Sequence, residues 1–335
     1  MSSFVTAEER ATRQIHTAGA IIIGDEILNG KVRACRQTMR LTKADNLSNF
    51  AKTVDTNSPF FARWCFSLGI NLKRIEVIAD DEDEIIEVSR RMSKTYDLVV
   101  TSGGIGPTLV LSVFIPRMSA QKIIYQMLMV RVLFRHDDIT YSSIAKAFGL
   151  ELKFHEETFD RMKKLSKPHS SQPDFSWNTP SPALTARLRM VHLPIDTTRD
   201  EKNQVLFVND KLWVPIAVVN GNLHILPGVP RLFENLLDSL KPMIRPRLAD
   251  DKGTLRVIFS TPLSESAVAP FLTELARRVE PRGIKVGSYP RWGKKMNTVT
   301  LVGKDVDYME SLVAEIEHGI RGVRVKVEGE RDHDS

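Results

Sequence analysis

Cysteine is the scarcest amino acid in this sequence of 335 residues, with only Cys35 and Cys65. Two widely separated cysteines provide neither a disulfide framework nor a cysteine-rich metal site, so the sequence favours a reducing compartment. The first sixteen residues are polar and of mixed charge, unlike a secretory signal. These features predict a cytoplasmic protein.

Long apolar runs and two familiar phosphate-binding motifs are also missing. No stretch reaches the roughly 18 uncharged apolar residues of a membrane span, so no membrane association is expected. The pattern GxxxxGK[ST] is absent, which excludes a P-loop nucleotidase. The spacing GxGxxG is absent too, which excludes the dinucleotide-binding motif of Rossmann domains.

Positive charge is in slight excess, because 47 lysines and arginines face 41 aspartates and glutamates. The excess is confined to two segments, 32–52 and 109–135. The net charge of these two segments together is more positive than the net charge of the whole chain. The rest of the protein is therefore slightly acidic. A basic stripe with interleaved aromatic residues is absent, so no nucleic-acid partner is expected.

The first half alternates between apolar runs and amphipathic segments. Strands are predicted at Thr17–Ile23, Asn71–Ile78 and Asp97–Ser102, with helices over Phe60–Leu68 and Asp80–Thr95. This alternation is typical of a doubly wound, mostly parallel α/β sheet. The acidic start of the second helix resembles a metal site, but a solvated helix start is the simpler interpretation.

The second half has a different order. Further helices are predicted at Ser142–Phe148, Glu157–Leu165 and Arg231–Leu240, strands at Trp213–Val219 and Asn222–Leu226, and a loop at 167–182. His155 is expected to be an exposed helix residue. From Thr254 to Lys326 the order β-α-β-β-α-β predicts a small α+β, ferredoxin-like domain. The predicted organisation is a polar segment 1–16, an α/β domain 17–245 and a small domain 254–328.

Glycines and acids gather where predicted parallel strands end, which is where open α/β sheets place ligands. Glycines let backbone N–H groups approach a phosphate, and a helix N-terminus adds partial positive charge. Carboxylates beside a phosphate usually need a divalent cation between them. The motifs are Gly24–Gly30 (GDEILNG), Asp55–Ser58 (DTNS), Gly103–Thr108 (GGIGPT), His136–Thr140 (HDDIT) and Leu226–Pro230 (LPGVP).

In this order the motifs resemble the molybdopterin-binding (MoaB/Mog-like) domain family. The similarity is greatest to the N-terminal region of bacterial CinA proteins and to the molybdopterin-binding-like domain of eukaryotic FAD synthases, and it covers residues 17–240. The segment Gly287–Gly293 resembles the small domain that follows in the FAD synthase relatives. The resemblance implies binding of a nucleotide-like or pterin-like phosphate compound. It also implies metal-dependent hydrolysis of dinucleotide pyrophosphates such as FAD or ADP-ribose.

The resemblance assigns roles to individual residues. Asp25, Asp137 and Asp138 are expected to be catalytic and to hold Mg²⁺ or another divalent metal. Thr140 either belongs to this group or only caps a helix. The expected phosphate-binding residues are Gly103, Gly104, Gly106, Thr108, Asn57 and Gly228.

Two other functions remain open. One is a molybdopterin-binding protein of molybdenum cofactor biosynthesis, and the other is a non-catalytic nucleotide-binding protein. The expected partners are a small-molecule ligand and, by analogy with MoaB/Mog relatives, further copies of the chain. No segment resembles the adenylyltransferase domain of FAD synthases, so FAD synthesis is not expected.

The sequence departs from the family pattern at the two basic segments. Without 32–52 and 109–135, the motifs become continuous as GDEILNGKTVDTNS and GGIGPTHDDIT. We hypothesise that both segments are translated introns, since valine codons can begin with GT and the codons of Lys52 and Arg135 can end in AG. The alternative is that both are genuine loops. Because the second segment separates the glycine turn from its acids, the chain as written is expected to be impaired in catalysis.

Overall fold

The computed structural model describes residues 5–28, 55–106, 109–111, 134–136, 139–166, 175–248 and 253–330. The chain forms two compact units, one of residues 1–65 and 70–249 and the other of residues 66–69 and 250–335. Within the described ranges, no helix is both long enough and apolar enough to cross a bilayer.

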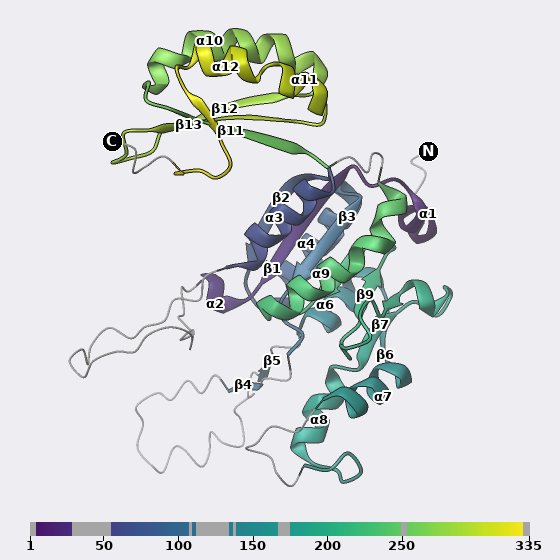
Figure 1. Ribbon diagram of the computed structural model, residues 1–335. Helices are drawn as coiled ribbons and strands as arrows, with labels where there is room; N and C mark the ends of the chain where they lie inside the picture. Colours follow the sequence, from purple (N-terminus) through teal and green to yellow (C-terminus); the bar gives the residue numbers. More distant parts are fainter. Residues whose placement is uncertain are drawn as a thin grey trace, which may run out of the picture. The chain divides into compact units, whose positions relative to one another are not determined.

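The first unit is built on a six-stranded sheet (Figure 1). Its strand order is β2 (Asn71–Ile78), β1 (Thr17–Ile23), β3 (Leu98–Ser102), β10 (Leu223–Leu226), β9 (Ile216–Val219) and β8 (Val205–Leu206). The pairs from β2 to β10 are parallel, whereas β9 and β8 run antiparallel to their neighbours. The prediction of a mostly parallel α/β sheet is therefore confirmed. All residues of β3, and six of the seven in β1, are buried, as expected for central parallel strands.

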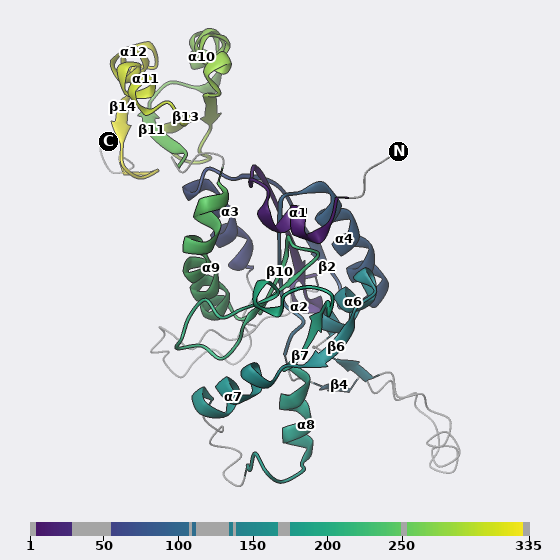
Figure 2. The ribbon, with the colours of Figure 1, turned by 90° about the vertical axis from the view of Figure 1, so that its right-hand side faces the viewer.

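Helices cover both faces of this sheet (Figure 2). On one face lie α4 (Glu82–Thr95) and α6 (Ile139–Phe148), whose Ile85, Met92 and Ile144 join the core formed with the strands. On the other face lie α3 (Asn57–Ser67) and α9 (Pro230–Ile244). The indole Nε1 of Trp64 in α3 donates a hydrogen bond of 3.0 Å to the Leu237 carbonyl in α9. The helix predicted over Phe60–Leu68 is therefore present, and its Phe61, Trp64 and Leu68 side chains are buried.

The N-terminal segment is part of this unit. It forms α1 (Ala7–Thr12), which starts with a capping box between Thr6 and Glu9. Arg13 lies 2.9 Å from Asp97 at the start of β3, and the other carboxylate oxygen of Asp97 accepts hydrogen bonds from the backbone and hydroxyl of Thr17. Polar residues thus tie the N-terminal segment to the amino ends of β1 and β3.

A tight hairpin reverses the chain between β9 and β10. Asn220 and Gly221 both have positive φ, 51° and 74°, in the three-residue connection between Val219 and Leu223, which pair across the hairpin. A Cβ atom on Gly221 would lie 2.0 Å from the Ala7 carbonyl oxygen, so glycine is also needed for close packing. The Asn-Gly pair accounts for the antiparallel pairing of β9 within a mostly parallel sheet.

The chain between α6 and β8 forms elements that the sequence analysis does not predict. They are β6 (Glu151–Phe154), β7 (His192–Ile195) and α8 (Pro182–Arg189), which accompany the predicted α7 (Glu156–Leu165). We call β6, β7, α7 and α8 the lobe. Strands β6 and β7 pair antiparallel in a separate two-stranded sheet. A 3₁₀ turn, Glu201–Asn203, precedes β8, and another, Arg245–Arg247, follows α9.

The expectation that His155 is an exposed helix residue is wrong. His155 is 5% exposed and precedes α7 as its N-cap. Its Nδ1 accepts the backbone N–H of Thr158 at 3.1 Å, and its Nε2 lies 2.9 Å from a carboxylate oxygen of Glu201. Capping therefore explains the position of this side chain.

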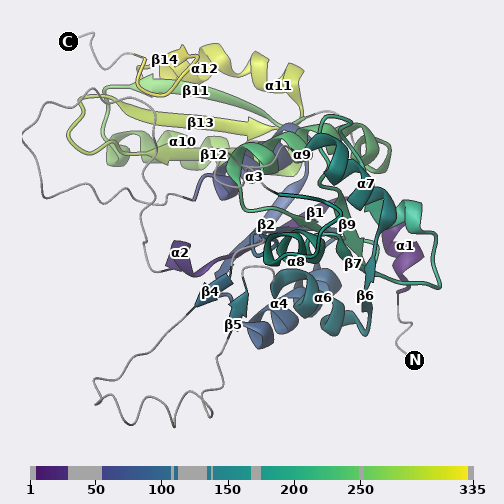
Figure 3. The ribbon, with the colours of Figure 1, turned by 90° about the horizontal axis from the view of Figure 1, so that it is seen from below.

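Two short strands pair at the ends of segment 109–135. Strand β4 (Leu109–Leu111) runs antiparallel to β5 (Phe134–His136), and Leu109 lies opposite His136 (Figure 3). This backbone ladder brings the residues on either side of the segment together.

The second unit contains a four-stranded antiparallel sheet of order β12-β13-β11-β14. The predicted element order is present as β11 (Leu255–Thr261), α10 (Glu265–Val279), β12 (Lys285–Tyr289), β13 (Asn297–Gly303), α11 (Val306–Ser311), α12 (Val313–Gly319) and β14 (Val323–Val325), with a 3₁₀ turn at Glu280–Arg282. The second helix of the predicted order is divided at Leu312 into α11 and α12. The Leu312 N–H bonds to the carbonyl of Met309, three residues back, and interrupts the α-helical ladder.

Asn222 is a buried connector whose loss is expected to destabilise the first unit. Its Nδ2 donates to the carbonyls of Ser93 and Tyr96, both at 2.8 Å, and its Oδ1 accepts the Ser93 hydroxyl at 2.6 Å. Asn222→Leu leaves these groups unpaired, so the free energy of unfolding should fall by about 3 kcal/mol in urea titrations. The exposed Asn178→Ala is the control. An unchanged Asn222→Leu midpoint would contradict this assignment.

His224 is expected to make stability depend on pH. It is 3% exposed, and burial lowers its pKa to about 4. Below pH 6.5 the unfolded chain binds a proton that the folded chain does not, so stability is complete above that pH and falls toward pH 4, by up to about 3 kcal/mol. His224→Gln should lose less stability than the parent between pH 7 and 4.5 in denaturant titrations. Equal losses in both proteins would show that His224 is not responsible.

Candidate functional site

The glycine turn after β3 is held in a conformation that only glycine tolerates. Gly103 and Gly104 have φ of 112° and 64°. A Cβ atom on Gly103 would lie 2.0 Å from the Ile23 carbonyl oxygen at the end of β1, and one on Gly104 would lie 2.1 Å from the Thr140 hydroxyl. The turn is therefore pressed against both β1 and α6.

Asn57 lies at the start of α3 and bridges two other chain segments. Its Nδ2 donates to the Ser102 hydroxyl at 2.8 Å and to the Gly228 carbonyl at 2.9 Å. The helix start is organised by Asp55, whose Oδ1 accepts the backbone N–H groups of Asn57 and Ser58 at 3.0 Å each. The side chain of Asn57 thus has a fixed orientation.

The other amide atom of Asn57 has an unsatisfied hydrogen-bonding capacity. Asn57 is 6% exposed, and its Oδ1 is buried with no hydrogen-bond partner among the described residues. A buried carbonyl oxygen without a partner costs free energy, so such atoms are expected to meet a ligand, an ion or water.

The turn after β10 closes on the same place. A Cβ atom on Gly228 would lie 3.1 Å from the Gly103 Cα, and the Gly103 N–H donates to the Leu226 carbonyl at 3.3 Å. Gly103, Gly104, Asn57 and Gly228, four of the predicted phosphate-binding residues, are therefore brought together at the carboxyl ends of β1, β3 and β10.

The residues of the glycine turn differ in whether their N–H groups are already hydrogen-bonded within the protein. Because the Gly103 N–H is already bonded to Leu226, it is not available to a phosphate. The N–H groups of Gly104, Ile105 and Gly106 bond to no acceptor among the described residues. These three groups are the donors that the turn can offer to an anion.

Asp25 follows β1 at the neighbouring position of the sheet edge, in the short helix α2 (Asp25–Leu28). Its backbone N–H donates to the Asp80 carboxylate at 3.1 Å, and the Asp80 N–H donates to the Asp25 carboxylate at 3.3 Å. Asp80 follows β2 as Asp25 follows β1, so two carboxylates lie side by side at this edge.

The acidic residues that follow β2 make two different kinds of contact. Asp81 accepts the backbone N–H groups of Asp83 and Glu84 and so caps α4, which agrees with its interpretation as a helix start. Asp80 instead faces Asp25 and is an acid that the sequence analysis does not assign to the site. Its position directly after a parallel strand is the signal that could have identified it.

Thr140 anchors α6 to the glycine turn. Its hydroxyl donates to the Gly103 carbonyl and its N–H to the Gly104 carbonyl, both at 3.1 Å. Thr140 lies inside the first turn of the helix and does not cap it with its side chain. Burial raises the pKa of the neighbouring Tyr141 above its usual range, so this phenol belongs to the core and stays neutral.

Three predicted site residues, Thr108, Asp137 and Asp138, lie outside the described residues. Among those described, no group of three histidine, cysteine, aspartate or glutamate side chains could hold a metal ion. The described carboxylates that lie side by side at the sheet edge are those of Asp25 and Asp80. Carboxylate oxygens are ligands that Mg²⁺ prefers.

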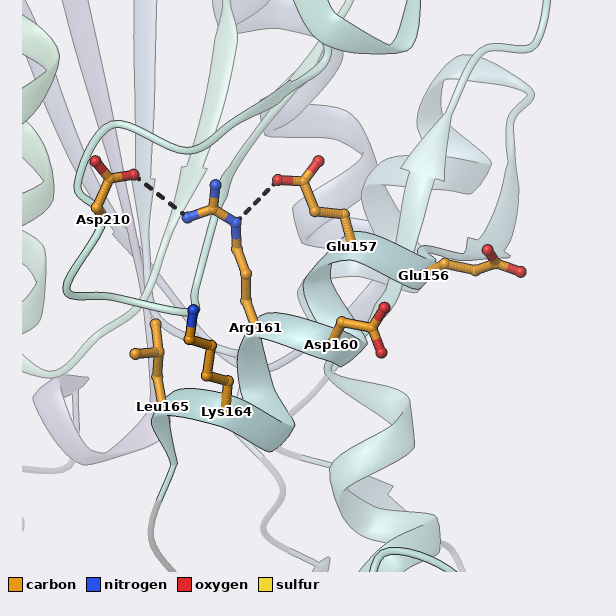
Figure 4. A pocket seen from close by; sticks show the side chains of 7 residues that line it. All are labelled: Glu156, Glu157, Asp160, Arg161, Lys164, Leu165 and Asp210. Carbon is orange, nitrogen blue, oxygen red and sulfur yellow. Dashed lines mark hydrogen bonds and ion pairs between the residues drawn. The ribbon is translucent and has the colours of Figure 1, made fainter.

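A separate hollow of about 590 Å³ lies on the surface of the lobe, lined by α7 and Asp210 (Figure 4). Arg161 stands in it, with Nε 2.9 Å from Glu157 and a terminal nitrogen 3.6 Å from Asp210. Its guanidinium carbon also lies 4.0 Å from the Phe207 ring centroid. Arg161 is therefore paired within the protein, and the hollow contains none of the residues of the candidate site.

Comparison with known proteins agrees with the motifs. Residues 19–109 match a family model described as a probable molybdopterin binding domain. The match ends at the first residue of the basic segment 109–135.

Curated relatives extend the similarity beyond that domain. The chain is 27% identical over 315 residues to a probable FAD synthase of Caenorhabditis elegans, covering 92% of this chain and 51% of that protein. A probable FAD synthase of Caenorhabditis briggsae is 27% identical over 320 residues, covering 90% and 50%. The chain thus spans about half the length of these two relatives. A Saccharolobus islandicus protein is 27% identical over 283 residues, covering 82% of this chain and 80% of its own length.

Solved structures include CinA from Thermoplasma acidophilum, with 26% identity, a TM-score of 0.43 and coverage of 68% of this chain and 98% of that one. MoaB from Pyrococcus furiosus has 16% identity, a TM-score of 0.33 and coverage of 69% and 92%. The family model and the curated relatives confirm the resemblance seen in the motifs. Residues 19–109 of this chain are therefore similar to the molybdopterin-binding domain family.

Proposed function

We propose that the carboxyl edge of the six-stranded sheet binds the phosphates of a nucleotide-like compound and hydrolyses its pyrophosphate bond with a divalent metal. FAD and ADP-ribose are the substrates to test first. The observation that carries this proposal is the Asn57 amide, which is fixed through Nδ2 while its buried Oδ1 has no partner among the described residues. A rigid, half-satisfied polar group beside a glycine turn favours a ligand site over a purely structural contact.

The glycine turn supports phosphate binding through its backbone. Gly104, Ile105 and Gly106 offer N–H groups, and Thr140 ties the N-terminus of α6 to the same turn. A helix N-terminus carries partial positive charge, so an anion at the turn would be stabilised by both features. Gly228 would lie on the opposite side of the bound phosphate because it packs against Gly103.

The proposal places the acids Asp137 and Asp138 beside the turn. Thr140, only two residues after Asp138, is hydrogen-bonded to Gly103 and Gly104, and two residues of extended chain span at most about 7 Å.

Asp25, Asp137 and Asp138 would hold Mg²⁺ or a similar ion, with Asp80 helping to orient Asp25. Bound there, such an ion would supply a Lewis acid for the phosphoryl group and a more acidic water ligand. The protein's own contribution is to position the pyrophosphate through the N–H groups of the turn and to keep the carboxylates close to it, while the Asn57 Oδ1 accepts a hydrogen bond from a hydroxyl or amino group of the ligand. Activity should therefore require both the acids and the turn.

A second candidate function is binding of a molybdopterin-type ligand without hydrolysis. The family match over residues 19–109 favours it, because the family is described by molybdopterin binding. The same phosphate-binding turn would serve either ligand. The similarity to FAD synthases over 92% of the chain favours the nucleotide as the first choice.

A hydrolysis assay with two forms of the chain tests the proposed reaction. The chain lacking 32–52 and 109–135 is expected to release nucleoside monophosphate from FAD or ADP-ribose with Mg²⁺, measured by chromatography. The chain as written should be slower, because the second segment separates the turn from its acids in sequence. Asp138→Asn in the shortened chain should lower kcat about a hundredfold, as expected for the loss of a metal-holding carboxylate.

The matched control is Asp160→Asn, which removes an exposed carboxylate on α7 and should leave kcat unchanged. If both forms fold but neither cleaves either substrate, the pyrophosphatase proposal is wrong and ligand binding without hydrolysis becomes the better explanation. Activity that survives Asp138→Asn at full rate would remove that residue from the site.

Asn57 can be tested without catalysis. In EDTA, Asn57→Ala should weaken ADP-ribose binding about tenfold in calorimetry, because one buried hydrogen bond from a hydroxyl or amino group of the ligand to the Asn57 Oδ1, worth about 1.4 kcal/mol, is lost. Asn71→Ala, at an exposed position in β2, is the control. Thermal unfolding of each variant checks that the loss of the bonds to Ser102 and Gly228 has not unfolded the unit. Unchanged affinity in a folded Asn57→Ala variant would exclude Asn57 from ligand binding.

A further inference from the structure

Strand β6 is an edge strand with an exposed apolar surface. Among the described residues its one strand neighbour is β7, and the lobe sheet has no third strand (Figures 2 and 3). Leu152 and Phe154 are 38% and 44% exposed. Open edges with exposed apolar side chains tend to pair with another strand.

The backbone groups that face outward can be identified from the ladder. His155 N–H donates to the Val191 carbonyl at 2.9 Å, so this pair is hydrogen-bonded across the sheet. Bonded residues alternate along an antiparallel strand, so Lys153 and Glu151 also bond toward β7. Leu152 lies opposite Pro194, which has no N–H to give. The N–H and C=O groups of Leu152 and Phe154 therefore point away from β7.

The charges on β6 are complementary to themselves. Glu151 and Lys153 share one face of the strand and Leu152 and Phe154 the other. If two copies of β6 run antiparallel about a twofold axis at Leu152, each Glu151 lies opposite Lys153 of the partner subunit. With the axis at Lys153, two lysines would instead lie opposite each other. Like charges directly opposite destabilise a sheet, so charge selects the first register.

We propose that the chain self-associates through β6, with a twofold axis at Leu152. The strands β7, β6, β6 of the partner subunit and β7 of the partner subunit then form one continuous four-stranded sheet. The two Leu152 residues exchange backbone hydrogen bonds, and the exposed apolar pairs of both copies lie on the same side of the sheet. Such an isologous contact closes after two copies and leaves no free β6 edge. The contact is independent of the proposed hydrolysis.

Charge reversal distinguishes this contact from non-specific association. The full chain should approach twice the mass of one chain in sedimentation or light-scattering experiments between about 1 and 100 μM, the range expected for a small interface. Lys153→Glu and Glu151→Lys should each weaken association about tenfold, because two opposite-charge pairs become two like-charge pairs. The double variant Glu151→Lys, Lys153→Glu restores the opposite pairs and should associate as the parent does.

Lys164→Glu, an exposed position on α7, changes the net charge as much as Lys153→Glu and should leave association unchanged. Thermal unfolding of each variant shows whether it is folded. A parent chain that stays monomeric across the whole range overturns the proposal. So does a folded double variant that associates no better than the single variants.

Discussion

The close approach of the Gly103–Gly104 backbone to β1 and α6 is the constraint on which the candidate site depends. A side chain at either position would occupy the space of the Ile23 carbonyl or the Thr140 hydroxyl. Because the turn can lie this close, the carboxyl ends of three parallel strands and the N-terminus of one helix meet within a few ångströms. A parallel sheet alone creates this edge, and the glycines allow backbone groups to occupy it.

Two buried asparagines in the first unit differ in how many of their amide atoms are hydrogen-bonded within the protein. Asn222 has partners for its donor and its acceptor, all within the protein, and joins β10 to the end of α4. Asn57 has partners for its donor alone. A fully bonded buried amide specifies the fold, whereas a half-bonded one leaves capacity for something that is not part of the chain.

Strong local patterns account for what the sequence predicts well. The uninterrupted apolar runs of β1 and β3 and the amphipathic pattern of α4 predict the parallel core, and five motifs predict where the site lies. Strands β6 and β7 are only four residues long and α8 lacks a clear apolar stripe, so local pattern is weak there. The pairing of Asp25 with Asp80 and of Asn57 with Ser102 depends on chain segments far apart in sequence, which spacing alone does not reveal.

The short ladder between Leu109–Leu111 and Phe134–His136 has an evolutionary consequence. When the two ends of a segment are paired, the entropic free-energy cost of closing the loop between them grows only with the logarithm of its length. This cost is about 0.6 kcal/mol for each doubling of the length. The free energy of unfolding then depends only weakly on the number of residues between the two strands. A segment at this junction could be gained, lengthened or removed over generations while the rest of the fold experienced little selection against the change.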